Sequence, residues 1–174
     1  MLFRSQRLYD QNVWNKAAVD AIVDSVVGYK LELVTSDELQ ANKQAGNPQQ
    51  KATALHFLKV CGGKWPIEEV LKSCQRDFEN TGNLYLELAR DDAGRPAGLF
   101  YLPSNTVRRH KNYTVYRQMR GGNTAYFWEY GAPDKPANYG EVIHLYRPNY
   151  TSTYYGVPEH LAALLPCFRP EAHH

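Results

Sequence analysis

The stretch Glu141–Leu165, EVIHLYRPNYTSTYYGVPEHLAALL, predicts a strand, an aromatic turn and the start of a helix. The apolar residues over 141–146 suit a strand that is buried or half-buried. Pro148 ends that strand, because proline has no N–H to donate to a sheet. Gly156 can adopt a positive φ, and Pro158 suits the first turn of a helix. The helix would then bury an apolar face made of Leu161, Ala162, Leu164 and Leu165.

Upstream, the stretch Thr81–Pro103, TGNLYLELARDDAGRPAGLFYLP, predicts a hairpin. From Leu84 onward leucines alternate with polar or aromatic residues, which is typical of a strand. Asp91–Gly94 is typical of a hairpin turn, with Gly94 in the left-handed conformation, and 97–102 is the return strand. A second hairpin is predicted to join 113–119 and 124–130 across Gly121, Gly122 and Asn123.

The N-terminal part has helical periodicity instead. Residues 11–27 predict an amphipathic helix that Asp10 caps and Gly28 ends. Its predicted buried stripe contains Val13, Trp14, Ala17, Ala18, Ala21, Ile22 and Val26. The segment 29–35 alternates enough to predict a strand, and 36–50 is polar, which indicates a loop or an exposed helix.

Two more helices are predicted before the strands begin. Asn47 would cap the first, with Pro48 in its first position, and this helix would run to about Val60 and bury Ala54, Leu55 and Leu58. Gly62 and Gly63 end it. Pro66 opens the second, which ends near Asn80 and has an apolar stripe of Ile67, Val70, Leu71, Cys74 and Phe78.

Helices come first in this order and strands come second. The pattern favours an α+β fold, with N-terminal helices packed on a mainly antiparallel sheet, over an alternating parallel sheet. The 174 residues fit one domain, 1–174.

The two quoted segments resemble the portal family of tailed bacteriophages, specifically the PBSX-type portals. In that family the first segment has a "GN" pair, a strand, an "R-D-x-x-G-R-P" turn, a second strand and "LP". The second segment follows it with an "EVIH" strand, an "RPN" turn and "YYGVP". The resemblance covers roughly Asn12 to Leu165. It implies the wing region of a portal, without the stem, clip and crown regions, so this chain is expected to be a truncated part of a longer type of protein.

The resemblance implies a viral structural protein rather than an enzyme. Portal subunits form a ring at one capsid vertex, and DNA is packaged and ejected through it. The expected partners are other portal subunits, terminase, capsid and head-completion proteins, and the DNA that passes through the ring, with no membrane. The expected location is the virion, or a prophage product in the host cytoplasm during assembly, and no cofactor is implied.

Composition agrees with a globular protein. Hydrophobic residues make up 43% and charged residues 22% of the chain, and the net charge of +2 is too small to indicate a nucleic-acid surface by itself. The 13 Tyr, 6 Phe and 3 Trp suit either strand faces or an interface. The three cysteines, Cys61, Cys74 and Cys167, are widely spaced, which indicates reduced thiols.

The chemistry of the sequence indicates contacts rather than catalysis. No nucleophile elbow, phosphate loop, HExxH or dinucleotide fingerprint occurs. The dense basic run Arg108, Arg109, His110 and Lys111 is either a solvated connection or a contact with DNA or an acidic neighbour. Tyr154 and Tyr155 either line a subunit contact or anchor the following segment on the sheet. The candidate contact residues are therefore Arg108, Arg109, Lys111, Tyr154 and Tyr155.

Three alternatives remain open from the sequence. The chain could be a small α+β adaptor module that binds nucleic acid or a peptide with its tyrosine-rich sheet. It could be a hydrolase that uses Glu87 or Asp91, although a turn aspartate is usually only a turn former. His144 and His160 could form a metal pair, but no carboxylate or cysteine is spaced to complete such a site, so no metal is predicted.

Overall fold

The first helix, α2 (Val13–Val27), begins where the side chain of Asn12 accepts hydrogen bonds from the backbone N–H groups of Trp14 and Asn15, at 3.0 and 3.1 Å. The predicted cap Asp10 is wrong, because residues 9–11 form a helical turn of their own before Asn12. Gly28 ends the helix as predicted. The computed structural model describes residues 9–28, 31, 33–34, 47–111, 114–136, 139–150 and 152–160.

The predicted buried stripe of α2 is wrong. Val19 and Val23 are the buried residues, and they pack against α5, whereas Val13, Trp14, Ile22 and Val26 are exposed. The error arose because apolar residues occur around the whole circumference of this helix, so periodicity alone does not single out one face.

Helix α4 (Pro48–Val60) begins as predicted, with the Asn47 side chain accepting from the N–H of Gln49 at 3.0 Å. Its predicted burial is wrong. Ala54 and Leu58 are only half-buried and Leu55 is exposed. The α4 residues that pack against the buried cluster of α5 are Phe57 and Leu58. The chain then turns through Gly62 and Gly63, as predicted.

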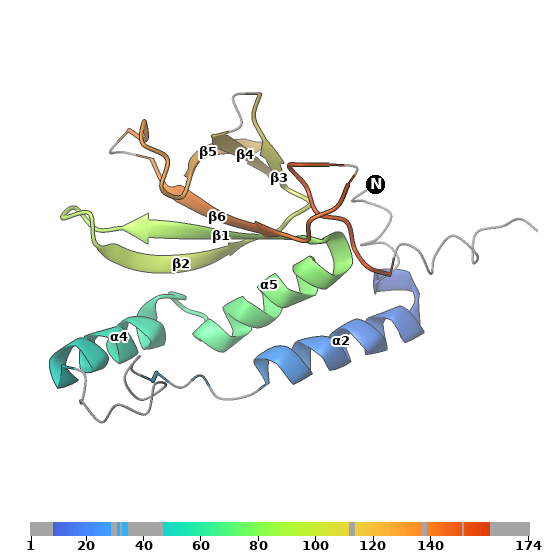
Figure 1. Cartoon of the computed structure of the whole chain (residues 1–174), viewed down its shortest axis with the longest axis horizontal. Helices are drawn as coiled ribbons and strands as arrows, with labels where there is room; N and C mark the ends of the chain where they lie inside the picture. The colour runs from blue at the N-terminus through green and yellow to red at the C-terminus, as the bar shows by residue number, and fades with distance from the viewer. Residues whose placement is uncertain are drawn as a thin grey trace, which may run out of the picture.

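Helix α5 (Ile67–Thr81) is the central helix of the fold. Its buried residues Ile67, Val70 and Cys74 follow the predicted stripe, while Leu71 and Phe78 on the same stripe are half-buried. Gly82 ends α5 in the left-handed conformation, at φ +71°. Figure 1 shows that α2, α4 and α5 lie together on one side of the sheet.

Six strands form one sheet in the order β2-β1-β6-β5-β4-β3. Their bounds are β1 (Asn83–Arg90), β2 (Pro96–Leu102), β3 (Val107–Arg109), β4 (Val115–Arg120), β5 (Asn123–Glu129) and β6 (Glu141–Tyr146). All neighbouring pairs are antiparallel except β5 and β6, which pair in parallel over two residue pairs. The predicted α+β class and mainly antiparallel sheet are confirmed.

Both predicted hairpins are confirmed. Gly94 in the first turn has φ +76°, and Gly121 and Gly122 in the second have φ +56° and +83°. Two consecutive residues with positive φ fit the right-handed twist of a two-residue hairpin. These turns explain why the strand order was predictable within each hairpin.

The sheet has an apolar layer on each face. One face packs against the helices, where Leu84, Leu86, Leu99 and Tyr101 meet the buried side of α5. The other face holds a cluster to which every strand contributes one residue: Leu102, Tyr85, Val142, Phe127, Tyr116 and Val107. Because the two edge strands β2 and β3 both reach this second cluster, the sheet curls around it.

Some predictions fall outside the described part of the chain. Leu31, Leu33 and Val34 are not in a strand, and the other residues of the predicted strand over 29–35 lie outside the described residues. The predicted helix after Pro158 also lies outside them from residue 161, and residues 158–160 are not helical. Among the described residues, no helix is long and apolar enough to cross a membrane.

Truncation of Ile67 tests the packing of α5. Ile67 is buried against the sheet, so Ile67→Ala is expected to lower the free energy of unfolding by about 2–3 kcal/mol. Leu145→Ala, at an exposed position of β6, is the matched control and is expected to lower it by less than about 1 kcal/mol. Urea titration followed by circular dichroism measures both, and equal losses would contradict this assignment of the core.

Candidate functional site

The start of β1 and the segment after β6 meet in a buried joint made of Gly82, Asn83 and Gly156. The two glycine backbones approach so closely that a Cβ on Gly156 would overlap the carbonyl oxygen of Gly82. That same oxygen accepts a hydrogen bond from the N–H of Arg147 at 2.8 Å. The prediction of a positive φ at Gly156 is wrong; glycine is required there because two backbones touch.

The buried side chain of Asn83 holds the joint together. Its Oδ1 accepts from the N–H of Gly156 at 2.8 Å, and its Nδ2 donates to the carbonyl oxygens of Gly156 at 3.2 Å and Thr81 at 2.7 Å. The Asn83 amide therefore bonds both the N–H and the C=O of Gly156. A residue of a neighbouring strand would bond the same two backbone groups.

Arg147 and Asn149 shape the segment that reaches the joint. The Arg147 guanidinium lies 4.8 Å from the ring centre of Phe78 on α5, and its Nη2 is 3.4 Å from Glu79. Asn149 accepts from the N–H of Ser152 at 3.1 Å and donates to the carbonyl of Tyr155 at 2.9 Å. The "RPN" turn thus fixes residues 147–150 and 152–156 against both α5 and the sheet.

His144 lies beside the joint, on β6. Its Nε2 is 3.2 Å from Asn83 Oδ1, and its Nδ1 is 3.2 Å from the hydroxyl of Tyr116. Because Asn83 Oδ1 is an acceptor, Nε2 carries the proton and Nδ1 is left as an acceptor that faces the Tyr116 hydroxyl. The same hydroxyl lies 3.3 Å from Glu129 Oε1, so its one proton is shared between two acceptors.

The imidazole of His144 also stacks on Tyr85, with ring centres 4.3 Å apart. Burial, together with the positive charge of Arg109, lowers the pKa of His144 to about 4, so the ring is neutral at neutral pH.

The structure gives the hypothesised histidine metal pair no support. Both ring nitrogens of His144 already have hydrogen-bond partners. Within the described ranges, no three His, Cys, Asp or Glu side chains lie close enough together to hold a metal ion.

Three of the predicted contact residues come together around Arg109 on β3. Its Nη2 donates to both carboxylate oxygens of Glu129 at 3.0 Å, and its guanidinium lies 5.2 Å from the ring centre of Tyr116 and 5.5 Å from that of Tyr154. Its backbone N–H donates to the hydroxyl of Tyr155 at 2.9 Å. The Arg109 side chain is only 13% exposed and its charge is compensated, so it anchors the tyrosine segment on the sheet.

Arg108 and Lys111 line a hollow together with Arg109. Successive residues of a strand point to opposite faces, so Arg108 is directed away from Arg109 and pairs across the sheet with Arg117. The hollow, of about 210 Å³, is lined by Arg108, Arg109, His110, Lys111 and Arg117. These side chains are all basic, and such a hollow attracts anions.

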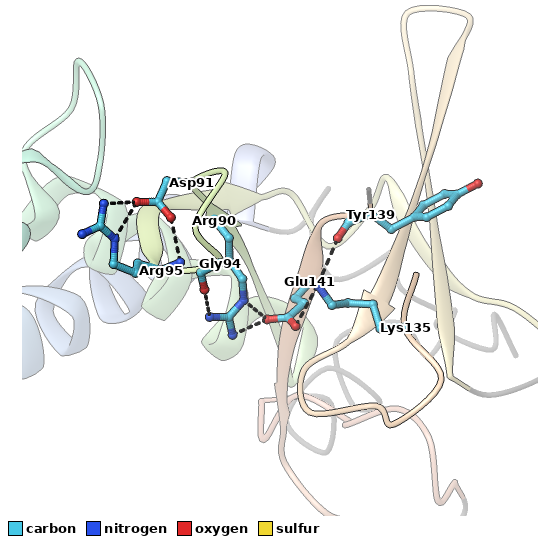
Figure 2. A network of polar contacts seen from close by, with 7 residues as sticks. All are labelled: Arg90, Asp91, Gly94, Arg95, Lys135, Tyr139 and Glu141. Atoms are coloured by element: carbon cyan, nitrogen blue, oxygen red, sulfur yellow. Dashed lines mark hydrogen bonds and ion pairs between the residues drawn. The ribbon is translucent and has the colours of Figure 1, made fainter. Parts of the chain in front are cut away.

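The opposite ends of β1 and β6 are joined by a second polar network (Figure 2). Arg90 donates to Oε2 of the buried Glu141 through Nε at 3.0 Å and Nη2 at 2.8 Å, and Lys135 Nζ is 3.2 Å from Oε1. Burial acts to raise the pKa of Glu141, but the hydrogen bonds and charges of Arg90 and Lys135 outweigh it and hold the pKa below its usual range. The network connects the first hairpin to the loop before β6.

The two carboxylates of the hydrolase hypothesis have separate environments. Asp91 caps its own turn, accepting from the N–H groups of Ala93 and Arg95 and from the Arg95 side chain, and these bonds lower its pKa. Glu87 lies in β1 between Phe100 and Val142 of the neighbouring strands, where burial raises its pKa. Asp91 is therefore a turn former, as the sequence indicated.

A fall in stability on acidification is expected from His144. In the unfolded chain histidine binds a proton near its ordinary pKa of 6.5, whereas folded His144 binds one only near 4, so stability is lost as the pH falls between these values. The free energy of unfolding should decrease by about 2 kcal/mol between pH 7 and pH 5.

Urea titrations at pH 7 and pH 5 measure this loss, and His144→Gln should remove most of it. The pKa of His160 is also lowered by burial, so His160→Gln serves as the comparison and should remove a smaller part. An undiminished pH dependence in His144→Gln would contradict the assignment.

The comparisons with known proteins point to phage elements. No family model matches the sequence. "Phage-like element PBSX protein XkdE" of Bacillus subtilis (strain 168) is 28% identical over 167 aligned residues, which cover 76% of this chain and 34% of XkdE. The "Uncharacterized protein YqbA" of the same strain is 26% identical over 144 residues, covering 66% of this chain and 28% of YqbA. This chain thus spans about a third of the length of these curated relatives.

Solved structures share the fold. A chain in the neck of an empty gene transfer agent (GTA) particle, computed with C6 symmetry, matches 94% of this chain and 41% of its own length, with a TM-score of 0.70 and 19% identity. A chain in the neck of the native particle, computed with C12 symmetry, matches 92% of this chain and 40% of its own length, with a TM-score of 0.68 and 18% identity. The predicted resemblance to PBSX proteins is supported by the similarity to XkdE, and chains in particle necks share the fold.

The sequence analysis missed the residues that make the joint. In the sequence analysis Asn83 occurs only within a quoted motif, Gly156 is expected to have a positive φ, and His144 is considered only as part of a metal pair with His160. Their contacts join residues 73 positions apart, as in Asn83 and Gly156. The sequence offered one indication of the joint: Gly82 and Gly156 lie in the two quoted motifs, and glycine is the residue that allows two backbones to touch.

Proposed function

We propose that this chain is the wing-like domain of a phage portal protein, forming one domain over residues 1–174. In this role it is part of a ring at the capsid vertex through which DNA is packaged and ejected. The observation that carries the proposal is the buried joint of Gly82, Asn83 and Gly156. The two sequence segments that resemble PBSX-type portals are also the segments that pack together there. The shared fold of the particle-neck chains supports it.

The proposed role is structural. The partners would be further copies of the same protein, the terminase, capsid and head-completion proteins, and the DNA inside the ring. The protein would be found in the virion and, during assembly, in the host cytoplasm. It would hydrolyse nothing itself, since the packaging energy would come from the terminase.

Electron microscopy tests this proposal. The product of the whole reading frame that contains this sequence is expected to form discrete rings in negative stain and to sediment as one large species. Immunogold labelling of particles should mark one vertex. A purified product that remains monomeric and is absent from particles would reject the portal role.

The basic hollow favours a second candidate, a nucleic-acid-binding adaptor. Five basic residues line it, and a hollow of about 210 Å³ could receive a phosphate group. A stand-alone adaptor would bind short duplex DNA as a monomer, with an affinity that falls steeply as the salt concentration rises. Lys111→Glu would weaken this binding. Arg95→Ala, in the exposed hairpin turn, is the control and would leave it unchanged. Fluorescence anisotropy measures this. Tight DNA binding by a chain that forms no rings would favour the adaptor over the portal.

A further inference from the structure

Helix α2 has an apolar face that nothing described in the structure covers. Its inner side packs on α5 through Val19 and Val23, and two ion pairs flank this contact, Asp20–Arg76 at 3.3 Å and Asp24–Lys72 at 3.4 Å. The opposite side is also apolar and is called here the outer face of α2. It consists of Val13, Trp14, Ala17, Ala18, Ala21, Ile22 and Val26.

The composition of the outer face is that of a packing surface. Trp14 is 86% exposed and Val13 is 78% exposed, although such residues are usually buried. The small side chains of Ala17, Ala18 and Ala21 on the same face would let another surface approach the helix closely. A helix that is apolar all round is normally covered on all sides, and contiguous exposed apolar patches mark interaction sites.

A complementary surface lies along α4. Phe57, Val60 and Ala54 contribute apolar side chains to a groove of about 1050 Å³ between α4 and the start of β2. Val60 is 47% exposed. This surface, called here the α4 groove, is large enough to receive an indole ring.

The charges of the two surfaces are complementary. Asp10 and Asp24 flank the outer face of α2, and both are exposed. Asp24 is also paired with Lys72, and α2 carries one basic residue, Lys16.

Helix α4 contains Lys51, His56 and Lys59 and has no acidic residue. The groove beside it is also lined by Asp91 and Arg95, which form an ion pair with each other. An acidic helix edge would therefore meet a basic one if the two surfaces touched.

The positions of the two surfaces fit a contact between copies. Figure 1 shows α4 at the left end and α2 at the right end of the helix layer beneath the sheet. Two different patches at opposite ends of one chain make a head-to-tail contact, and this kind of contact generates rings when the rotation closes. Chains with the same fold occur in particle necks computed with C6 and C12 symmetry.

From these observations we infer that the outer face of α2 in one copy docks into the α4 groove of the next copy. The inference rests on the proposed function, because it supplies the repeated contact that a ring needs. Trp14 would fill the groove beside Phe57 and Val60, with the flanking charges fixing the direction.

Cross-linking between two tagged versions of the full 174-residue chain tests the inference. Both versions carry Cys167→Ser; one carries Ala18→Cys and the other Val60→Cys, and a short bis-maleimide joins them. The native Cys61 and Cys74 are buried. The expected product is the mixed dimer, and its yield should fall at least tenfold when Trp14→Glu is added. Tyr126→Glu, at an exposed position of β5, is the control and should leave the yield unchanged.

Each other outcome counts against the inference. Cross-links between two Ala18→Cys chains instead of mixed dimers would show a symmetric α2–α2 contact. A lower melting temperature of Trp14→Glu in dilute solution, where the chain is monomeric, would show that the chain covers its own helix. No cross-link at either position would remove the contact altogether.

The test separates this inference from the proposed function. Rings in micrographs without Ala18–Val60 cross-links would leave the portal role standing and reject this contact. Mixed dimers from a protein that forms no rings would keep the contact, as an open head-to-tail association, and reject the ring.

Discussion

Gly156→Ala is expected to lower the free energy of unfolding by about 4 kcal/mol or more, which is among the largest effects of a single substitution. The added methyl group would overlap the carbonyl oxygen of Gly82. This neighbour is backbone, so it cannot rotate away as a flexible side chain would. The joint would have to open, and the hydrogen bonds of Asn83 to Gly156 would lengthen or break.

Gly94→Ala is the matched control. Gly94 has φ +76°, but no atom lies within 4 Å of the position of an added Cβ. Its replacement should therefore cost only the left-handed backbone strain of about 1–2 kcal/mol. Urea titration of both variants measures the difference. If Gly94→Ala is as damaging as Gly156→Ala, the close approach of the two backbones is not what requires glycine at position 156.

Asn83→Ala is expected to lower the free energy of unfolding by about 3–5 kcal/mol. The substitution leaves the N–H and C=O of Gly156 and the carbonyl of Thr81 without their partner in a buried place. Each unsatisfied buried group costs about 1–3 kcal/mol, although such losses do not add fully.

Gln118→Ala controls for the loss of a polar side chain from a strand. Gln118 is half-buried and makes one bond, 3.2 Å long, to Thr106, so its truncation should cost less than about 1 kcal/mol. Thermal unfolding followed by circular dichroism compares the two. A double variant with Gly156→Ala should lose less than the sum of the single losses, because both disrupt one joint; full additivity would show that they act separately.

Local chemistry made the hairpins and α5 predictable. The turn at Asp91–Gly94 and the glycine pair at 121–122 need only their own residues to set the backbone, so the strands on either side follow. Helix α5 was predicted because its polar and apolar residues separate cleanly onto two faces. The cap at Asn47 was equally local.

Features that depend on distant partners were not predictable. Helix α2 is apolar around its circumference, so the choice of its inner face depended on α5 and not on its own sequence. The parallel pairing of β5 with β6 depends on how the intervening loop returns, which no turn motif specifies. Of the candidate contact residues, Arg109, Tyr154 and Tyr155 share a cluster. Arg108 points to the other face because strand side chains alternate, and Lys111 lies beyond the end of β3. The contact role predicted for these five residues remains a prediction.

The central position of β6 has a consequence for how the chain reaches its native state. Strands β1 and β2, and likewise β4 and β5, are neighbours in sequence and can pair early, since short loops close quickly. The inner edges of β1 and β5 have no partner until β6, the last of these six strands to be synthesised, pairs with both of them. On the ribosome, the nascent chain therefore holds two separate hairpins with unpaired inner edges. It becomes a single cooperative unit only after residue 156 has emerged and Asn83 can close the joint.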